Sequence, residues 1–291
     1  MKPAILFCVA SMAAVLALGA CQQPSAPSSS ASASAARAST PVISAPAATS
    51  TPASASTAPV PGDHAVTRHY KIAVAMPTLP AVDKPLVDAM RTTADNAKRD
   101  FVQALPDPKA LPEFANRQFE LRLDFKLAAQ TPAFLSVRET GMADTGGAHP
   151  NPVEAAFVFD RKAGKLIALD DLFADADAAR RALANFAHDA LLKKLMANAP
   201  KPGEGSPEAI REWKVNTAQM LDDGTKPTTV NYSVFVVRAG ATADAPSPGL
   251  TLVFPPYQVA PYVYGTQRVE VPASVFTKLL KPAYASDFAA N

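Results

Sequence analysis

The sequence predicts an α+β fold with antiparallel sheets, segregated helices and two closely associated subdomains, preceded by a signal peptide and a disordered linker. Three observations predict it. Apolar and charged residues alternate over residues 118–128, which is typical of a strand with one wet face. Three longer segments repeat apolar residues at three- and four-residue spacing, as amphipathic helices do. Residues 22–62 have neither pattern, and strands and helices do not alternate regularly along the rest of the chain.

The chain begins with the layout of a secretory signal. Lys2 precedes an apolar stretch at residues 4–18 that is too short to cross a bilayer comfortably, and small residues precede Cys21. The sequence Leu-Gly-Ala-Cys at 18–21 resembles the lipobox of bacterial lipoproteins, in which the cysteine becomes the acylated first residue of the mature chain. We therefore expect a signal peptide at residues 1–20 and lipidation of Cys21.

Cysteine usage agrees with this expectation. The only other cysteine, Cys8, lies inside the signal, so the mature protein would have one thiol and no disulfide. Two or more acyl chains hold a protein stably at a membrane. The lipobox resemblance, together with Gln22, implies an envelope protein anchored in the outer membrane and facing the periplasm. An uncleaved anchor and an ordinary secretory signal are the alternatives.

Residues 21–62 are expected to form a disordered tether. They consist almost entirely of Ala, Ser, Pro and Thr and carry one charge, Arg37. Such a segment buries too little apolar surface to offset its ordering entropy. Without Lys2 and Arg37, 26 basic residues balance 26 acidic ones, all at or after Asp63. This balance, without a basic run, argues against nucleic acid as a partner.

The first half of the remaining chain is predicted to be rich in strands. The helix expected there has Leu86, Met90 and Phe101 on one face and stops before Pro106. The predicted elements are, in order, a strand at 66–76, a helix at 83–105, strands at 118–128, 134–140 and 153–159, and a hairpin partner at 165–169.

The second half is predicted to contain helices and then strands. Ser206 is the expected N-cap of a helix with Pro207 in its first turn, Gly224 after its end and Trp213 in the core. The predicted elements are, in order, helices at 178–197 and 207–221, strands at 230–238, 249–254 and 268–271, and a short helix at 272–280.

Two loops stand apart from this scaffold. The first, Thr-Gly-Gly-Ala-His-Pro-Asn at 145–151, presents His149 after two adjacent glycines. The second, at 254–265, is dense in proline and tyrosine. Rigid aromatic rings on a proline-stiffened loop lose little entropy on binding. The candidate ligand-binding residues in the two loops are His149, Pro256, Tyr257, Pro261 and Tyr262.

These two loops, in this order, resemble an extracytoplasmic domain of unassigned activity. It occurs in RsiV-type anti-sigma factors and in the non-catalytic part of PdaC-type peptidoglycan deacetylases. The resemblance covers roughly residues 66–280 and implies two subdomains, at 63–150 and 151–291. It also implies a binding module at the cell wall, which captures lysozyme in the anti-sigma factors. We expect neither the cytoplasmic segment nor the deacetylase domain of those relatives in this protein.

The expected function is therefore that of a membrane-anchored, non-catalytic binding lipoprotein that recognises a lysozyme-like protein or peptidoglycan. Neither an enzymatic activity nor a cofactor or metal is expected. The chain has no Gly-x-Ser-x-Gly elbow, and its four histidines are scattered. Asp170 and Asp171 are expected to satisfy free amides at a helix start. The alternative is a cell-wall hydrolase with a site around His149.

The role of His149 itself stays open between three possibilities, which are holding the turn through backbone hydrogen bonds, contacting a ligand, and catalysis. Tyr257 is the ring expected to be exposed. Tyr262 and Tyr264 are expected either to line the site or to pack against Trp213 and the sheet.

Overall fold

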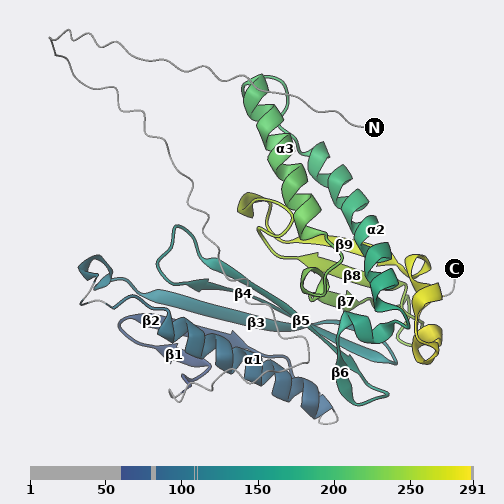
Figure 1. Cartoon of the computed structure of the whole chain (residues 1–291). Helices are drawn as coiled ribbons and strands as arrows, with labels where there is room; N and C mark the ends of the chain where they lie inside the picture. Colours follow the sequence, from purple (N-terminus) through teal and green to yellow (C-terminus); the bar gives the residue numbers. More distant parts are fainter. Residues whose placement is uncertain (1–59, 80–82, 108, 110, 290–291) are drawn as a thin grey trace, which may run out of the picture. The chain divides into compact units, whose positions relative to one another are not determined.

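The structure, a computed structural model, describes residues 60–79, 83–107, 109 and 111–289 (Figure 1). The predicted signal peptide, Cys21 and residues 21–59 of the predicted tether lie outside the described residues. Among the described helices, none has the length and apolar character needed to cross a membrane.

The fold is α+β, as predicted, and its larger sheet contains six strands in sequence order. They are β1 (His64–Val66), β2 (Tyr70–Ala75), β3 (Phe119–Gln130), β4 (Phe134–Asp144), β5 (Asn151–Asp160) and β6 (Lys165–Ile167). Neighbouring strands are antiparallel except β2 and β3, which are parallel. The helix α1 (Lys84–Gln103) lies between these two in sequence, so the sheet is mixed and contains one βαβ unit.

The predicted patterns of β3 and α1 form the first core. Phe119, Leu121, Leu123 and Phe125 are buried, while the intervening residues of β3 are exposed or half-buried. The buried stripe of α1 packs in the same cluster. Its members are Leu86, Met90, Ala94, Ala97 and Phe101. One face of the sheet is therefore covered by α1 (Figure 1).

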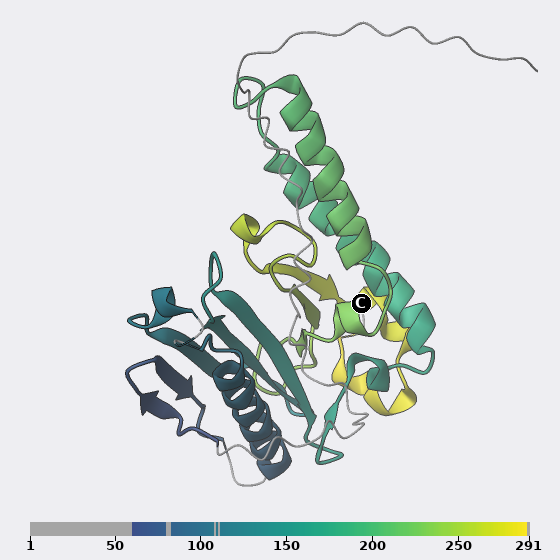
Figure 2. The ribbon, with the colours of Figure 1, turned by 60° about the vertical axis from the view of Figure 1, so that its left-hand side comes forward.

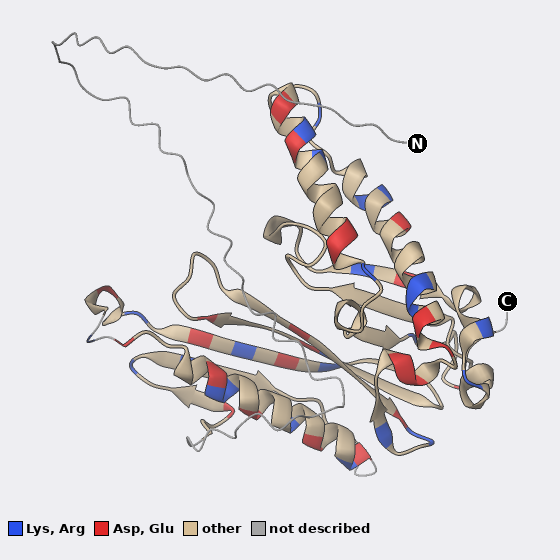
Figure 3. Ribbon diagram, in the orientation of Figure 1, with Lys and Arg blue, Asp and Glu red and all other residues tan. Residues whose placement is uncertain are grey.

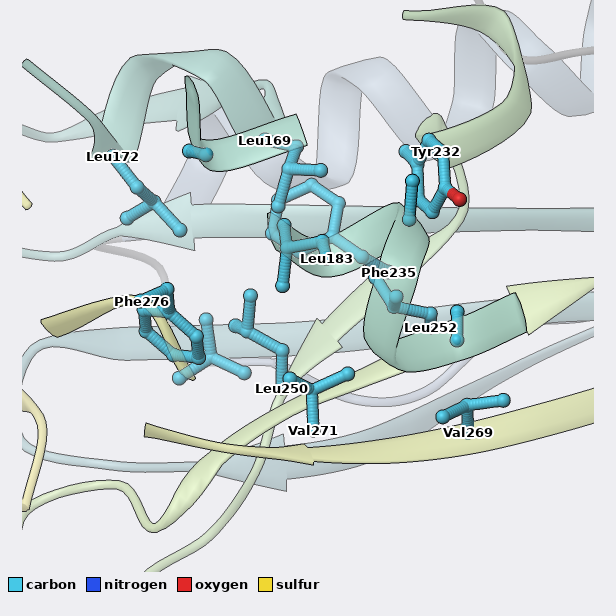
Figure 4. Close-up of a cluster of buried hydrophobic side chains, with 14 of the residues drawn as sticks. Leu169, Leu172, Leu183, Tyr232, Phe235, Leu250, Leu252, Val269, Val271 and Phe276 are labelled. Carbon is cyan, nitrogen blue, oxygen red and sulfur yellow. The ribbon is translucent and has the colours of Figure 1, made fainter. Parts of the chain in front are cut away.

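The smaller sheet contains three antiparallel strands, β7 (Phe235–Val237), β8 (Gly249–Phe254) and β9 (Gln267–Pro272). The helix α2 (Ala176–Ala197) and the preceding 3-10 helix η3 (Leu169–Leu172) cover it with apolar side chains. Leu183 of α2 lies among Leu250, Val271 and Phe276 in this second core (Figure 4).

The helix α3 (Pro207–Gly224) packs on α2 and begins as predicted. The Ser206 hydroxyl accepts a hydrogen bond from the Ala209 N–H at 3.2 Å. The helix ends at Gly224, where a Cβ would come within 2.0 Å of the Gln258 carbonyl oxygen. Only glycine fits this contact, which holds the end of α3 against the loop between β8 and β9.

The two sheets are joined by a buried serine. Ser136 Oγ on β4 accepts a hydrogen bond from the Val237 N–H on β7 at 3.1 Å and lies 3.4 Å from the Val237 carbonyl oxygen. The boundary that the sequence predicts at residue 150 falls between β4 and β5, which are hydrogen-bonded neighbours in the six-stranded sheet.

Several predicted elements differ from the structure. The strand predicted at 66–76 is a hairpin, because Thr67 Oγ1 accepts hydrogen bonds from the N–H groups of His69 and Tyr70 and turns the chain. The strand predicted at 230–238 begins with a 3-10 helix, η4 (Val230–Tyr232). The helix predicted at 272–280 is two 3-10 turns, interrupted where Phe276 adopts φ −134° and enters the core.

Trp213 was predicted to be buried in the core, and this is wrong. It is half-buried, because the buried residues of α3 all lie nearer its C-terminal end, at Thr217, Leu221 and Gly224. The spacing of apolar residues identifies one face of a helix, but it does not show whether another element covers that face.

Candidate binding site

The two loops that the sequence singles out meet in the structure. The turn between β4 and β5 carries His149, and the loop between β8 and β9 carries Tyr257 and Tyr262. The two loops lie side by side in Figure 1 and Figure 2. His149 Nε2 lies 2.7 Å from the Tyr257 hydroxyl oxygen, although the two residues are 108 positions apart in sequence. Neither loop contains a charged residue, and both are tan in Figure 3.

The hydrogen bonds of the His149 ring define its donors and acceptors. Nδ1 lies 3.1 Å from the Pro150 carbonyl oxygen, which can only accept, so Nδ1–H donates. In the neutral imidazole, Nε2 is then an acceptor, and the Tyr257 O–H donates to it. Both ring nitrogens are thus engaged, one with its own turn and one with the other loop.

Tyr262 completes a cluster of three rings. It stacks on His149 with ring centroids 4.1 Å apart and an interplanar angle of 16°. Tyr257 contacts both other rings, at centroid distances of 5.8 Å from His149 and 5.6 Å from Tyr262. We call His149, Tyr257 and Tyr262 the aromatic site. Tyr257 is 41% exposed, and the other two rings are half-buried.

The loop holds Tyr257 in an unusual backbone conformation. Its φ is +70°, and it is the only residue other than glycine with a positive φ among the described residues. Such a conformation costs on the order of 1–3 kcal/mol and persists only where the surroundings enforce it. Here the Tyr257 N–H donates to the Ala260 carbonyl at 3.1 Å. The Gln258 side chain donates to the carbonyls of Gly224 and Asn231, both at 2.9 Å.

The prolines frame this loop. Pro256, one of the predicted ligand-binding residues, is buried and therefore lies beneath the surface of the loop. Pro261 is half-buried and begins the 3-10 helix η5 (Tyr262–Tyr264). The fixed φ of proline at both positions limits the conformations of the loop and sets the direction of the two tyrosines.

The turn that carries His149 is fixed by its glycine and by an acid. Gly146 has φ +100°, where a Cβ would press against the rings of Phe119 and Phe114. Its N–H donates to Asp144 Oδ1 at 3.0 Å, and Arg117 donates to both oxygens of the same carboxylate at 2.8 and 2.9 Å. The glycine of the predicted motif therefore shapes the turn, and His149 extends from a rigid support.

A buried polar group ties the second loop to the large sheet beside the aromatic site. Glu154 on β5 accepts from Thr266 Oγ1 at 2.7 Å and from Arg138 on β4 at 2.5 Å. The sequence does not indicate this contact, because nothing in the spacing of Glu154 and Thr266 shows that they meet.

Further apolar side chains lie on the same loop and on α3, which that loop contacts through Tyr264. Val263, on the same loop, is 84% exposed. Tyr264 packs against Trp213 of α3 at a centroid distance of 6.1 Å, as one of the two predictions for this ring expected. Val215, two residues further along α3, is 59% exposed.

The other candidate residues are engaged in structural contacts. Asp171 Oδ2 accepts from the Ala168 N–H at 2.9 Å at the start of η3, and Asp170 pairs with Arg180 of α2. His188 lies 2.9 Å from an oxygen of Asp222. Within the described part of the chain, no three His, Cys, Asp or Glu side chains are grouped so that they could hold a metal ion.

Comparison with known proteins identifies the C-terminal part of the chain. Residues 170–274 match the family described as "Protein of unknown function (DUF3298)". The fold is similar to the crystal structure of a DUF3298 family protein from Pseudomonas aeruginosa PAO1. The two are 19% identical, with a TM-score of 0.40 over 60% of this chain and 66% of that one.

A member of the DUF3298 family from Bacteroides fragilis NCTC 9343 is also similar. It is 18% identical, with a TM-score of 0.41 over 68% of this chain and 69% of that one. The chain thus spans about two thirds of the length of each of these proteins. No curated protein matches it. The chain therefore carries a DUF3298 domain of unknown function at residues 170–274, which includes Tyr257 and Tyr262 but not His149.

Proposed function

We propose that this protein is a membrane-anchored, non-catalytic binding lipoprotein of the cell envelope. In this proposal Cys21 carries the lipid, and the anchor lies in the outer membrane, facing the periplasm. The domain recognises a wall-associated ligand, either a lysozyme-like protein or peptidoglycan, through the aromatic site. The observation that carries the proposal is the hydrogen bond between His149 Nε2 and the Tyr257 hydroxyl.

Three properties of the aromatic site support binding. The rings are held in place before any ligand arrives, by the hydrogen bonds that enforce the loop conformation at Tyr257 and by the stacking of Tyr262 on His149. Little entropy is therefore lost when they are covered. Tyrosine has an apolar ring and a polar tip, which suits both protein surfaces and sugar rings. The neighbouring Val263 adds exposed apolar surface.

The alternative, a cell-wall hydrolase, would use the same histidine. A general base needs a ring nitrogen within reach of a substrate proton. In the structure both nitrogens of His149 are occupied, by the Pro150 carbonyl and by Tyr257. This arrangement favours a role in positioning the aromatic ring over proton transfer.

Retention assays test the binding proposal. The full chain, purified in detergent, is passed over immobilised hen egg-white lysozyme and mixed with purified peptidoglycan sacculi. We expect one of the two to retain the wild type, and Tyr262→Ala to weaken retention up to about tenfold, since an aromatic contact contributes about 0.5–1.5 kcal/mol. Val66→Ser, which changes an exposed residue of β1, is the matched control. No retention by either ligand would contradict the proposal.

The same samples separate binding from hydrolysis. Release of soluble wall fragments by the wild type, lost in His149→Ala, would favour the hydrolase. The anchor is tested separately, by labelling cells with a palmitate analogue. The wild type should be labelled and recovered with membranes, whereas Cys21→Ala should be unlabelled.

A further inference from the structure

The strand β6 covers only one end of β5. It pairs with Val158–Asp160, whereas β5 begins at Asn151. In Figure 1, β6 is a short arrow beside the long β5. A strand edge with unpaired backbone groups is a template for another strand, and natural proteins usually cover or disrupt it.

The hydrogen bonds at the end of β5 show which groups face this edge. The Arg161 N–H donates to the Ala133 carbonyl on the β4 side. The Asp160 carbonyl accepts from the Gly164 N–H on the β6 side. Backbone groups of successive residues point to opposite sides of an antiparallel strand.

The N–H and C=O groups of Glu154 and Ala156 therefore face the β6 side, beyond the end of β6. Within the described residues, no backbone or side-chain group is hydrogen-bonded to them. The side chains of both residues are buried or half-buried. The two faces of β5 are therefore covered here, whereas the backbone groups along its edge are unpaired.

Both layers that cover the sheet extend past this edge. They leave a cavity of about 270 Å³ beside Ala156, between α1 on one side and the segment 229–235 on the other. The side chains that line it from these two elements include Thr92, Thr93 and Asn96 of α1 and Tyr232, Ser233 and Phe235. The position that an additional strand would occupy is thus already enclosed on two faces.

The end of the cavity next to η3 contains a carboxylate oxygen without a hydrogen-bond donor. Asp170 is the only charged residue among those that line it. One of its oxygens pairs with Arg180, while Oδ1 is buried and accepts no hydrogen bond from the described residues. An occupant with an N–H donor or a cationic group at this end would satisfy it.

We propose that an extended peptide segment of a partner protein binds here as a seventh strand, in line with β6. Its backbone pairs with Glu154 and Ala156, its apolar side chains enter the cavity, and a donor meets Asp170. The unpaired N–H and C=O groups of alternate residues match the repeat of another extended backbone, which selects a peptide over a compact small molecule. The backbone groups that pair with the peptide belong to Glu154 and Ala156 and not to the aromatic site, although the Glu154 side chain contacts Thr266 next to the loop of that site.

A phage-displayed library of random dodecapeptides is the probe, with the full chain in detergent as bait. The substitution Ala156→Pro removes the N–H that faces the open edge without removing one that pairs with β4. Ala156→Ser keeps that N–H and is the matched control. Selected peptides should bind Ala156→Pro about tenfold more weakly than the wild type, since one hydrogen bond and the fit are lost, and Ala156→Ser nearly as well as the wild type.

Amide hydrogen exchange gives a second readout that needs no variant. Without peptide, the Glu154 and Ala156 amides should exchange rapidly, and a selected peptide should protect both. His149→Ala should leave this protection unchanged, which distinguishes failure of this site from failure of the aromatic site. No enriched peptide, equal binding by Ala156→Pro, or peptides that leave both amides unprotected would overturn the proposal.

Discussion

The Lys98 ammonium group, nearly fully buried on α1, donates a hydrogen bond to Asp63 Oδ1 over 2.8 Å. Asp95 lies at the same distance on the other side, and Arg91 donates to the second oxygen of Asp63 at 2.8 Å. Asp63 is also the first acidic residue after the predicted tether. This contact therefore attaches the residue that directly precedes β1 to the helix α1.

Replacing Asp63 with asparagine should destabilise the protein, because Lys98 would remain buried with one carboxylate instead of two. We expect a loss of about 1–2 kcal/mol in the free energy of unfolding at pH 7. Urea denaturation of the full chain measures it. Asp88→Asn removes an exposed ion pair with Lys84 and should cost less than half as much.

The effect of Asp63→Asn should also depend on pH. The hydrogen bond from Lys98 lowers the pKa of Asp63 below its ordinary 3.8, against the opposing effect of burial and with a further contribution from Arg91. A lowered pKa in the folded state contributes stability that is present above the unfolded value and is lost as pH falls through the folded value. The difference between Asp63→Asn and wild type should therefore shrink below pH 4.

Glu139 should have the opposite pH dependence. It lies on β4 with its side chain 1% exposed, and Oε1 has no hydrogen-bond partner among the described residues. Burial, followed by the nearby charge of Glu154, raises the pKa of Glu139 from 4.5 to about 7. Between these values the folded protein holds a proton that the unfolded chain releases, so stability falls as pH rises through this window.

The substitution Glu139→Gln removes this cost. At pH 8 it should stabilise the protein by up to about 3 kcal/mol, and at pH 4 it should have little effect. Urea denaturation at both values tests this, with the exposed Glu212→Gln as a control that should show no such difference. A variant with the same effect at pH 4 and pH 8 would show that ionisation of Glu139 is not responsible.

Tyr257→Phe should change His149 without removing the ring. Without the Tyr257 hydroxyl, His149 Nε2 loses its hydrogen-bond donor, while Nδ1–H still donates to the Pro150 carbonyl. We expect a loss of about 1 kcal/mol in stability. The ¹⁵N signals of the imidazole should show a shift at Nε2 and none of similar size at Nδ1. Equal shifts at both nitrogens, or none, would contradict the tautomer derived above.

Gly224→Ala should disturb the loop from a distance. Its Cβ would come within 2.0 Å of the Gln258 carbonyl oxygen, and the Gln258 side chain fixes the same loop. Overpacking of this kind costs about 1–3 kcal/mol. Thermal unfolding should show the loss, together with weaker retention on the wall ligand. Gly205→Ala is the control, because a Cβ at this exposed glycine would meet its nearest neighbours, on Ala209 and Ile210, at 3.9 Å, which is ordinary van der Waals contact.

Local patterns in the sequence predict much of the fold. The alternation from Phe119 to Phe125 gives the buried face of β3, and the stripe of α1 gives the buried face of that helix. Leu127 was predicted to lie on the same face of β3, but it is 44% exposed because the register of β3 and β4 shifts between Leu127 and Ala129. The parallel pairing of β2 with β3 is not predicted, because the two strands are separated in sequence by α1 and no local pattern shows that they pair. The turn at Thr67, which shortens the expected first strand, is not predicted either.

The aromatic site is predicted in part. The glycine turn and the proline–tyrosine loop single out His149, Tyr257 and Tyr262, because the neighbouring glycines and prolines set the backbone conformation around these residues. Their hydrogen bond and stacking depend on a contact across 108 residues that no local pattern contains. The sequence does not indicate the open edge of β5 either, because this edge exists only since β6 is short and pairs with no residue of β5 before Val158.

Site-specific photocrosslinking in living cells tests the proposed binding role most directly. Val263, 84% exposed beside the aromatic site, is replaced by p-benzoylphenylalanine, and Val66, 73% exposed on β1, serves as the control position. The proposed binding role predicts an irradiation-dependent adduct with a wall protein or glycan from position 263 and none from position 66. No adduct from 263, or equal adducts from both positions, would contradict it.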